Sequence, residues 1–182
     1  MMKNDPLKWL LYSQSSAILG SSLVFPFYLL FIKDIGTSYG QFGLSYGLFT
    51  LSSAFVHLFV GKYTDKMGSM IFLAMYSFGM SLAFLLLPIL TALWQVYTMQ
   101  IFLGVLGAMQ KTSEKIVIAD LTSGHERGRA IGHYHFWTTI FSAFAIIIGG
   151  YLADLLTVDV IFYIGAVSMF ASSLLTVKLL ST

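Results

Sequence analysis

The sequence predicts an all-α membrane protein, a single bundle of six transmembrane helices over residues 1–182. Of the 182 residues, 57% are hydrophobic and only 10% are Asp, Glu, Lys or Arg, and the mean hydropathy is +0.82. A soluble domain carries about 25% charged residues, so most of this chain must face something other than water, which excludes a soluble enzyme. The net charge of +2 is too small and scattered for a nucleic-acid surface. Without cysteine, disulfides and cysteine-ligated metals are excluded.

Uncharged stretches place the helices, because a helix needs about 20 residues to cross the bilayer core. Four runs each hold one span, namely residues 9–32, 35–61, 130–153 and 160–177. The run 67–110 is long enough for most of two, with a hairpin expected near Pro88–Gln95, where a proline stop meets interfacial side chains. The first run is too long for a secretory signal and no cleavage site follows it. The predicted helices are residues 8–32, 39–61, 69–90, 94–119, 129–155 and 159–180.

The basic residues predict that both termini are cytoplasmic, because short loops rich in Lys and Arg stay on that side of the membrane. On the side of the termini fall Lys3, Lys8, Lys62, Lys66, Lys115, Arg127, Arg129 and Lys178. Only Lys33 falls on the other side. We therefore expect a multi-pass protein of the cytoplasmic membrane.

The connection between the second and third predicted helices carries a motif. It reads Gly61-Lys62-Tyr63-Thr64-Asp65-Lys66-Met67-Gly68 and fits the pattern Gly-x-x-x-Asp-basic-x-Gly. Gly61 would let two helix ends approach closely, Asp65 could cap a helix N-terminus, and Gly68 allows a tight turn. An ordinary positive-inside turn is the alternative interpretation.

This segment resembles the loop between helices 2 and 3 of the major facilitator superfamily. The stretch from Asp120 to Gly132 resembles that family's connection between helices 4 and 5. With the six spans, the resemblance covers essentially the whole chain as the N-terminal half of such a transporter, and it implies a 3+3 inverted repeat. The residues that it marks are Gly61, Asp65, Lys66 and Gly68 in a conformational-switch motif, and Asp120, Arg127 and Arg129 in the second loop. An ion pair of Asp120 would have to come from Lys66, Arg127 or Arg129.

The sequence also departs from this family. The basic residues that usually follow the first motif are replaced by Ser69 and Met70. Helix 4 carries Gln100 where the family often has an arginine, and helix 5 keeps only Gly149 and Gly150 of a glycine-rich antiporter pattern. The resemblance therefore implies a transporter of this fold more than it implies drug/proton antiport.

One face of the predicted helix 94–119 is polar. Gln100, Gly104, Gly107, Lys111 and Glu114 follow a 4-3-4-3 spacing, which keeps them within an arc of about 80°. A lysine near the bilayer centre costs roughly 2.5–3.5 kcal/mol on the insertion scale, so we expect Lys111 and Glu114 to face the bundle interior or water, and to pair with each other. An ion pair that only locks this helix to its neighbours is the alternative.

The predicted helix 8–32 carries a second polar group. Gln14, Ser15, Ser21 and Ser22 form two i,i+7 pairs on adjacent faces, and Pro26 is expected to bend the helix. Serines in membrane helices more often hydrogen-bond their own backbone than a ligand. Gln14 and Ser21 are candidates for the transport path, and Gln14 is favoured because its amide both donates and accepts.

Together these features predict a half-size secondary transporter, not an enzyme, that moves a small solute by alternating access, by symport or antiport. Glu114 would be the proton-titrating group, with Lys111 setting its charge balance. No cofactor or metal is expected, since His133 and His135, two apart on a helix, point about 200° apart. The expected partners are membrane lipid, the solute, and a second six-helix half, either another copy or a separate chain. The alternatives are a non-transporting assembly module and a truncated half of a longer transporter.

Overall fold

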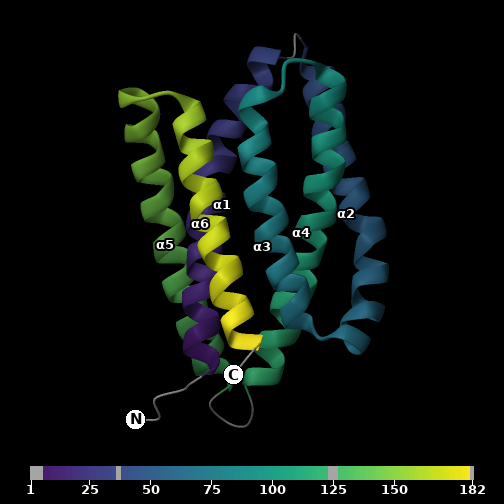
Figure 1. Ribbon diagram of the computed structural model, residues 1–182, viewed down its shortest axis with the longest axis vertical. Coiled ribbons are helices and arrows are strands. Elements are labelled where there is room, and N and C mark those ends of the chain that lie inside the picture. The colour runs from purple at the N-terminus through teal and green to yellow at the C-terminus, as the bar shows by residue number, and fades with distance from the viewer. Residues whose placement is uncertain (1–5, 36–37, 123–126, 181–182) are drawn as a thin grey trace.

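In the computed structural model, the described residues form six long helices joined by short connections (Figure 1). The structure describes residues 6–35, 38–122 and 127–180. The elements are α1 (Pro6–Ile35), α2 (Tyr39–Met67), α3 (Ser69–Leu86), a 3-10 turn η1 (Leu87–Ile89), α4 (Leu93–Leu121), α5 (Arg127–Leu155) and α6 (Val158–Leu180). Lys3 and the side chain of Lys33, both used to predict the orientation, lie outside the described residues.

The hairpin between α3 and α4 falls where the sequence places it. Pro88 lies in η1, where its missing N–H costs nothing. The side-chain oxygen of Gln95 then accepts the backbone N–H groups of Thr91 and Ala92, at 2.8 and 3.0 Å. These bonds satisfy donors that would otherwise be left open at the start of α4.

The helix contacts show an inverted repeat of two three-helix units. The helices α3 and α6 pack against each other, α1 packs on α5 and α6, and α4 packs on α2 and α3 (Figure 1). Exchanging α1 with α4, α2 with α5 and α3 with α6 maps each of these contacts onto another contact of the set. Successive helices alternate in direction, so the exchanged helices run oppositely and the repeat is inverted. The predicted all-α fold with a 3+3 repeat is confirmed.

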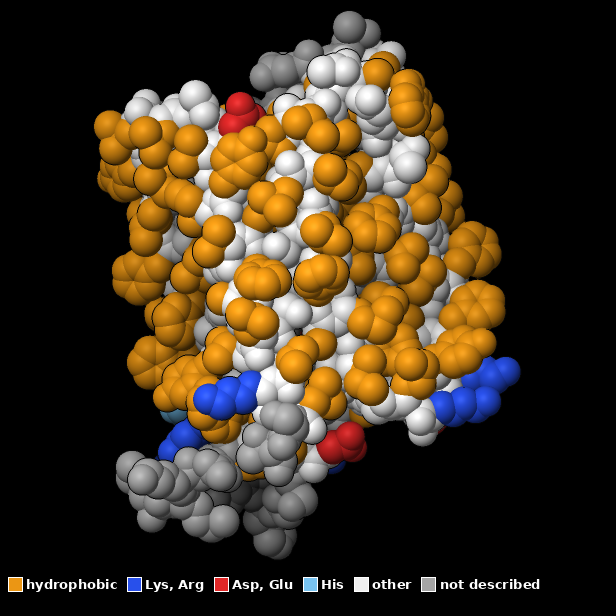
Figure 2. Space-filling model, viewed as in Figure 1, with side chains coloured by type: hydrophobic (Ala, Val, Ile, Leu, Met, Phe, Trp, Pro, Cys, Tyr) orange, Lys and Arg blue, Asp and Glu red, His pale blue; other side chains and the backbone are white. Residues whose placement is uncertain are grey.

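The surface and the hydropathy of the helices suit a bilayer. Within the described residues, α2, α3, α5 and α6 are long and apolar enough to cross a membrane by composition alone. The helices α1 and α4 are as long, at 30 and 29 residues. Figure 2 shows hydrophobic side chains over the middle of one face and Lys and Arg near its lower end, where α1 begins and α6 ends.

The structure corrects the predicted end of the second helix. It continues to Met67, beyond the expected end at Gly61, because the first charge ends the apolar span and not the helix, and no helix breaker occurs in residues 62–67. Gly61 mediates no close approach, since a Cβ there would meet nothing within 4 Å. Asp65 is exposed, and no described side chain caps α3, so its expected capping role is wrong. The turn itself is made by Gly68, with φ of +89°.

Small residues let α1 and α6 pack closely. A Cβ added to Gly20 would lie 2.9 Å from the carbonyl oxygen of Gly165, so the backbones touch there. Two to three turns away, the Ser13 hydroxyl lies 3.3 Å from that of Ser172 and 2.5 Å from that of Thr176. Close backbones and buried hydroxyl pairs hold membrane helices together where lipid gives no hydrophobic drive.

Candidate functional site

Two adjoining cavities lie between α1, α2 and α4. The smaller, of about 250 Å³, is also bounded by α3, and the larger measures about 430 Å³. Phe25, Phe49 and Lys111 line both cavities, so we treat them as one site, the central cleft. Its remaining walls are Ile18, Ser21, Ser22, Tyr76, Met80, Leu103, Gly107 and Gln110 in the smaller part, and Pro26, Tyr28, Tyr46 and Gln100 in the larger.

The polar stripe of α4 serves more than one purpose. Gln100, Gly107 and Lys111 line the cleft, as their spacing of seven and four residues on a helix predicts. Gly104 instead faces α2, because a Cβ there would collide with the Phe49 carbonyl and the Ser52 hydroxyl. Gly104 therefore lies where α2 and α4 approach closely and is not a cleft residue.

The expected pairing of Lys111 with Glu114 is absent. Within the described residues no carboxylate lies within ion-pairing distance of Lys111, whose side chain is exposed into the cleft. Glu114 is partly buried, and its two oxygens accept hydrogen bonds from the Tyr134 hydroxyl at 2.6 Å and from the Gln110 side-chain amide at 2.8 Å. Three residues turn a helix by about 300°, so the two side chains diverge by about 60°, one toward the cleft and one toward α5.

Tyr134 and Gln110 are site residues that sequence reasoning missed. Gln110 precedes Glu114 by one helical turn, and this i,i+4 spacing, visible in the sequence, favours a hydrogen bond between the two side chains. Tyr134 comes from α5 and reaches Glu114 only through the packing of two helices. It also borders a third cavity of about 120 Å³ with Lys8 and His133, near the end of the bundle where α1 begins.

The candidate residues of α1 separate into buried and cleft-facing positions. Gln14 is 0% exposed, lines neither part of the central cleft, and neither atom of its amide has a described partner. Its expected place on the solute path is therefore not what the geometry shows. Ser21 does line the cleft, and its hydroxyl also donates to the Ile18 carbonyl at 3.1 Å. Ser22 ties α1 to α5 through Ser142, at 2.7 Å.

The residues of the two loop motifs lie apart from the cleft. Lys66 and Asp120, near the ends of α2 and α4, are exposed, as are Arg127 and Arg129 at the start of α5. In the part of the chain that the structure describes, Asp120 makes no ion pair with any of these basic side chains. Their exposure to water explains the absence, since an exposed ion pair gains little free energy.

A histidine that the cleft does not use joins α2 to α4. The Nδ1 atom of His57 lies 2.7 Å from the Thr112 hydroxyl, and its Nε2 lies 3.3 Å from the Ser53 hydroxyl. Thr112 is the residue after Lys111, so this contact fixes the register of α4 beside α2 at the level of the cleft.

A six-helix membrane unit, with an inverted repeat and a polar cleft beside the first helix of each repeat, has the architecture of one half of a membrane transporter. The sequence profile of the Major Facilitator Superfamily matches residues 10–182. The chain belongs to this superfamily of transporters.

Relatives of two lengths match the chain. YitZ of Bacillus subtilis (strain 168), named as an uncharacterized MFS-type transporter, is 50% identical over 158 residues, which cover 87% of this chain and 96% of YitZ. The multidrug resistance protein MdtG of Proteus mirabilis (strain HI4320) is 27% identical over 167 residues, 89% of this chain but 41% of MdtG. MdtG of Yersinia enterocolitica is 28% identical over 160 residues, 85% of this chain and 38% of that protein. The chain thus spans nearly all of YitZ and about two fifths of MdtG.

Proposed function

We propose that this chain is a half-size secondary transporter that carries a small solute by alternating access, two six-helix halves rocking around a shared site. The observation that carries the proposal is Lys111 in the central cleft. A lysine at membrane depth is costly unless it faces water or a partner group, and ionisable side chains there usually mark a solute or ion path. A packed assembly module would have no need to keep this charge in an open cleft.

A second copy of the chain is the other half in this proposal. An even number of helices puts both ends of each copy on the same side, so two copies insert in the same orientation. A twofold axis along the membrane normal then brings their clefts face to face. The relative YitZ supports this arrangement, because its match to 87% of this chain takes up 96% of its own length.

Cysteine crosslinking tests the dimer, since the chain has no cysteine of its own. Phe25→Cys on α1 lies at the cleft, and Phe170→Cys on α6 is a matched aromatic position that is also exposed but lines neither part of the cleft. In native membranes a short bismaleimide should trap dimers of Phe25→Cys and leave Phe170→Cys monomeric. Crosslinking at Phe170 alone, or at neither position, would contradict the face-to-face dimer.

Glu114 is the proton site in this proposal. The ionised carboxylate accepts a hydrogen bond at each oxygen, from Tyr134 and from Gln110. Protonation turns one oxygen into a donor, so one of these partners must reorient. Because Tyr134 belongs to α5 and Gln110 lines the cleft, that change links the charge of Glu114 to the packing of α4 on α5 and to the cleft wall.

The variant Glu114→Gln tests this role, because it keeps the shape of the side chain and removes the titration. Uptake of a panel of radiolabelled solutes into proteoliposomes, driven by an imposed pH gradient, should be lost, while solute exchange without a gradient continues. Asp154→Asn, an exposed carboxylate at the end of α5, is the control and should keep full uptake. Unchanged gradient-driven uptake by Glu114→Gln would remove Glu114 from the mechanism, and absence of flux in a dimeric wild-type preparation would favour the assembly module.

A further inference from the structure

We infer that the central cleft binds an organic anion, a solute with a carboxylate or similar oxyanion on an apolar body. The inference rests on the proposed transport function for its physiological meaning, but its first test is binding alone. Three properties of the cleft carry it: the sign of its charge, an unused hydrogen-bond donor, and aromatic walls.

The charge of the cleft has one sign. Lys111 lines both parts, and no described carboxylate lines either. Glu114, less than one turn further along α4, accepts hydrogen bonds from Tyr134 and Gln110 and makes no ion pair with the lysine. Away from bulk water a single ammonium attracts an anion far more strongly than it would in solution.

Among its described residues, an identical partner offers no carboxylate that would pair with Lys111 at the cleft. Apart from Glu114, the described carboxylates lie at or near helix ends, namely Asp65, Asp120, Asp154 and Asp159. In the proposed dimer the described residues of the second copy would therefore add a second Lys111 and no compensating acid. The shared site would then hold two ammonium groups, which favours an anionic solute and disfavours a cationic one.

A second donor lies on the wall of the larger part. Tyr28 is 3% exposed, lines the same cavity as Lys111, and its hydroxyl has no hydrogen-bond partner within the described residues. A buried hydroxyl without a partner is costly, so a ligand oxygen or water is its natural acceptor. The Gln100 amide lines this cavity as well and offers a neutral polar group.

The remaining walls suit an apolar body. Phe25, Pro26, Tyr46 and Phe49 surround the larger cavity, whose 430 Å³ falls within the range of about 300–1,000 Å³ found for small-molecule sites. Mostly apolar walls with a few placed polar groups are the usual composition of such sites. The cleft therefore matches a solute in which one anionic head is attached to an aromatic or aliphatic body.

A head-group series tests the inference on the full chain in lipid nanodiscs. The probes are 4-phenylbutyrate, 4-phenylbutanol and 4-phenylbutylamine, which share one body and differ in charge. Competition against tritiated 4-phenylbutyrate should rank the carboxylate first, the alcohol well behind it and the amine last. Equal binding of the three probes, or preference for the amine, would overturn the inference.

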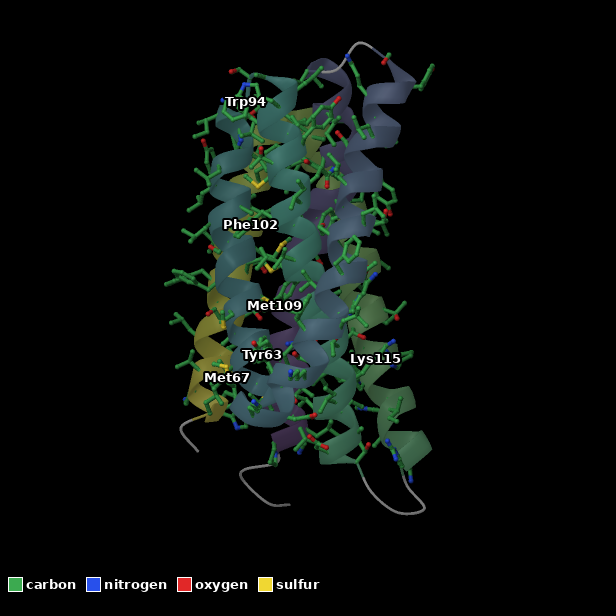
Figure 3. The ribbon with its side chains drawn as sticks, turned by 90° about the vertical axis from the view of Figure 1, so that its right-hand side faces the viewer. Tyr63, Met67, Trp94, Phe102, Met109 and Lys115 are labelled. Carbon is green, nitrogen blue, oxygen red and sulfur yellow. The ribbon has the colours of Figure 1, made fainter. Side chains whose placement is uncertain are left out.

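Variants of Lys111 test whether this side chain causes the preference for the carboxylate probe. Lys111→Gln should weaken 4-phenylbutyrate binding roughly 10- to 100-fold, the range expected for a hydrogen bond to a charged group, and leave the alcohol unchanged. Lys111→Arg should retain binding. Lys115→Gln is the matched control, because Lys115 is exposed on the same helix one turn further on and lines neither part of the cleft (Figure 3). An equal loss in both glutamine variants would contradict the inference.

Tyr28→Phe gives an independent readout if Lys111→Gln fails to fold, which size-exclusion chromatography would reveal. This variant should weaken the binding of 4-phenylbutyrate about 2- to 10-fold and affect the binding of 4-phenylbutanol less. If the carboxylate binds in a Lys111-dependent way but is not taken up into proteoliposomes, the anion site is supported and the proposed transport function is contradicted. If solutes are taken up with no preference among the head groups, the transport function is supported and the anion site is overturned.

Discussion

The α3–α6 side of the bundle and the cleft beside α1 and α4 use polar side chains in opposite ways. Between α3 and α6, the Ser81 hydroxyl donates to the Ala166 carbonyl at 2.8 Å, and the Ser173 hydroxyl donates to a carbonyl of α3 at 3.3 Å. At the cleft, Lys111 and the Tyr28 hydroxyl have no such partner among the described residues. Polar groups that are satisfied inside the protein hold helices together, whereas unsatisfied ones at a cleft are available to water or a solute.

Hydropathy follows the same division. The spans of α3 and α6 have mean hydropathies of 2.1 and 2.0, the highest of the four spans found in the described residues, whereas α1 and α4 carry polar side chains such as Gln14, Gln100 and Lys111. The first pair of helices is stabilised by lipid and by tight packing. The second pair gives up part of that stabilisation to keep polar groups beside a cleft.

The largest effect is expected where α6 packs on α1. A Cβ at Gly165 would collide with the Val24 side chain and lie 3.2 Å from both the Gly20 carbonyl oxygen and the Phe84 ring. Gly165→Leu should therefore destabilise the fold by about 1–3 kcal/mol or more, seen as a lower Tm in detergent by tryptophan fluorescence. Gly150→Leu on α5, where a Cβ meets nothing within 4 Å, should change stability by less than about 0.5 kcal/mol. Equal Tm values for the two variants would contradict the tight packing of this side.

The second effect is one of access to water. Lys111→Cys should react with a charged, membrane-impermeant thiol reagent added to open membrane fragments, because its side chain lies in the cleft. Ser172→Cys should stay unmodified, since Ser172 is 0% exposed between α1, α3 and α6. If Lys111→Cys is not labelled, as judged by the absence of a mass shift on a gel, water does not reach the cleft.

The third effect concerns the proton site beside the cleft. Tyr134→Phe removes the 2.6 Å hydrogen bond to Glu114 and leaves the rest of the ring in place. Uptake driven by a pH gradient should fall roughly tenfold, as expected for one hydrogen bond to a charged group, while exchange without a gradient changes less. Tyr151→Phe is the control, because Tyr151 lies on the same helix and is 68% exposed. An identical drop in driven uptake and in exchange would assign Tyr134 a structural role only.

The sequence predicts the helices well because the bilayer imposes one simple rule. Uncharged runs of sufficient length must be spans, and α4, expected at 94–119, runs from Leu93 to Leu121. The rule fails at the water boundary, where α2 passes Gly61 without interruption. There the charges of Lys62, Asp65 and Lys66 end the apolar span, yet a helix whose charged side chains reach water can continue.

The site is only partly predictable, for a geometric reason. Spacing along one helix puts Lys111, Gly107 and Gln100 on one face, and that face does line the cleft. Spacing alone cannot say which neighbour a given face meets. The i,i+7 pattern of α1 groups Gln14 with Ser21, although the first is buried and the second lines the cleft. Likewise, the partner of Glu114 on α5 follows from helix packing and not from any local pattern.

The smallest effect compares two serines of α1. The hydroxyls of Ser16 and Ser168 each donate to the backbone carbonyl of the other residue at 2.8 Å, which ties α1 to α6. Ser16→Ala should lower stability by about 0.6 kcal/mol, the average for such interhelical bonds, and leave probe binding unchanged. Ser21→Ala, at the cleft, loses only a bond to its own helix and should leave Tm unchanged while altering 4-phenylbutyrate affinity up to a few-fold. Measured together, the two variants separate stability from binding on one helix, and the reverse outcome would show that the cleft and the packed side are not distinct.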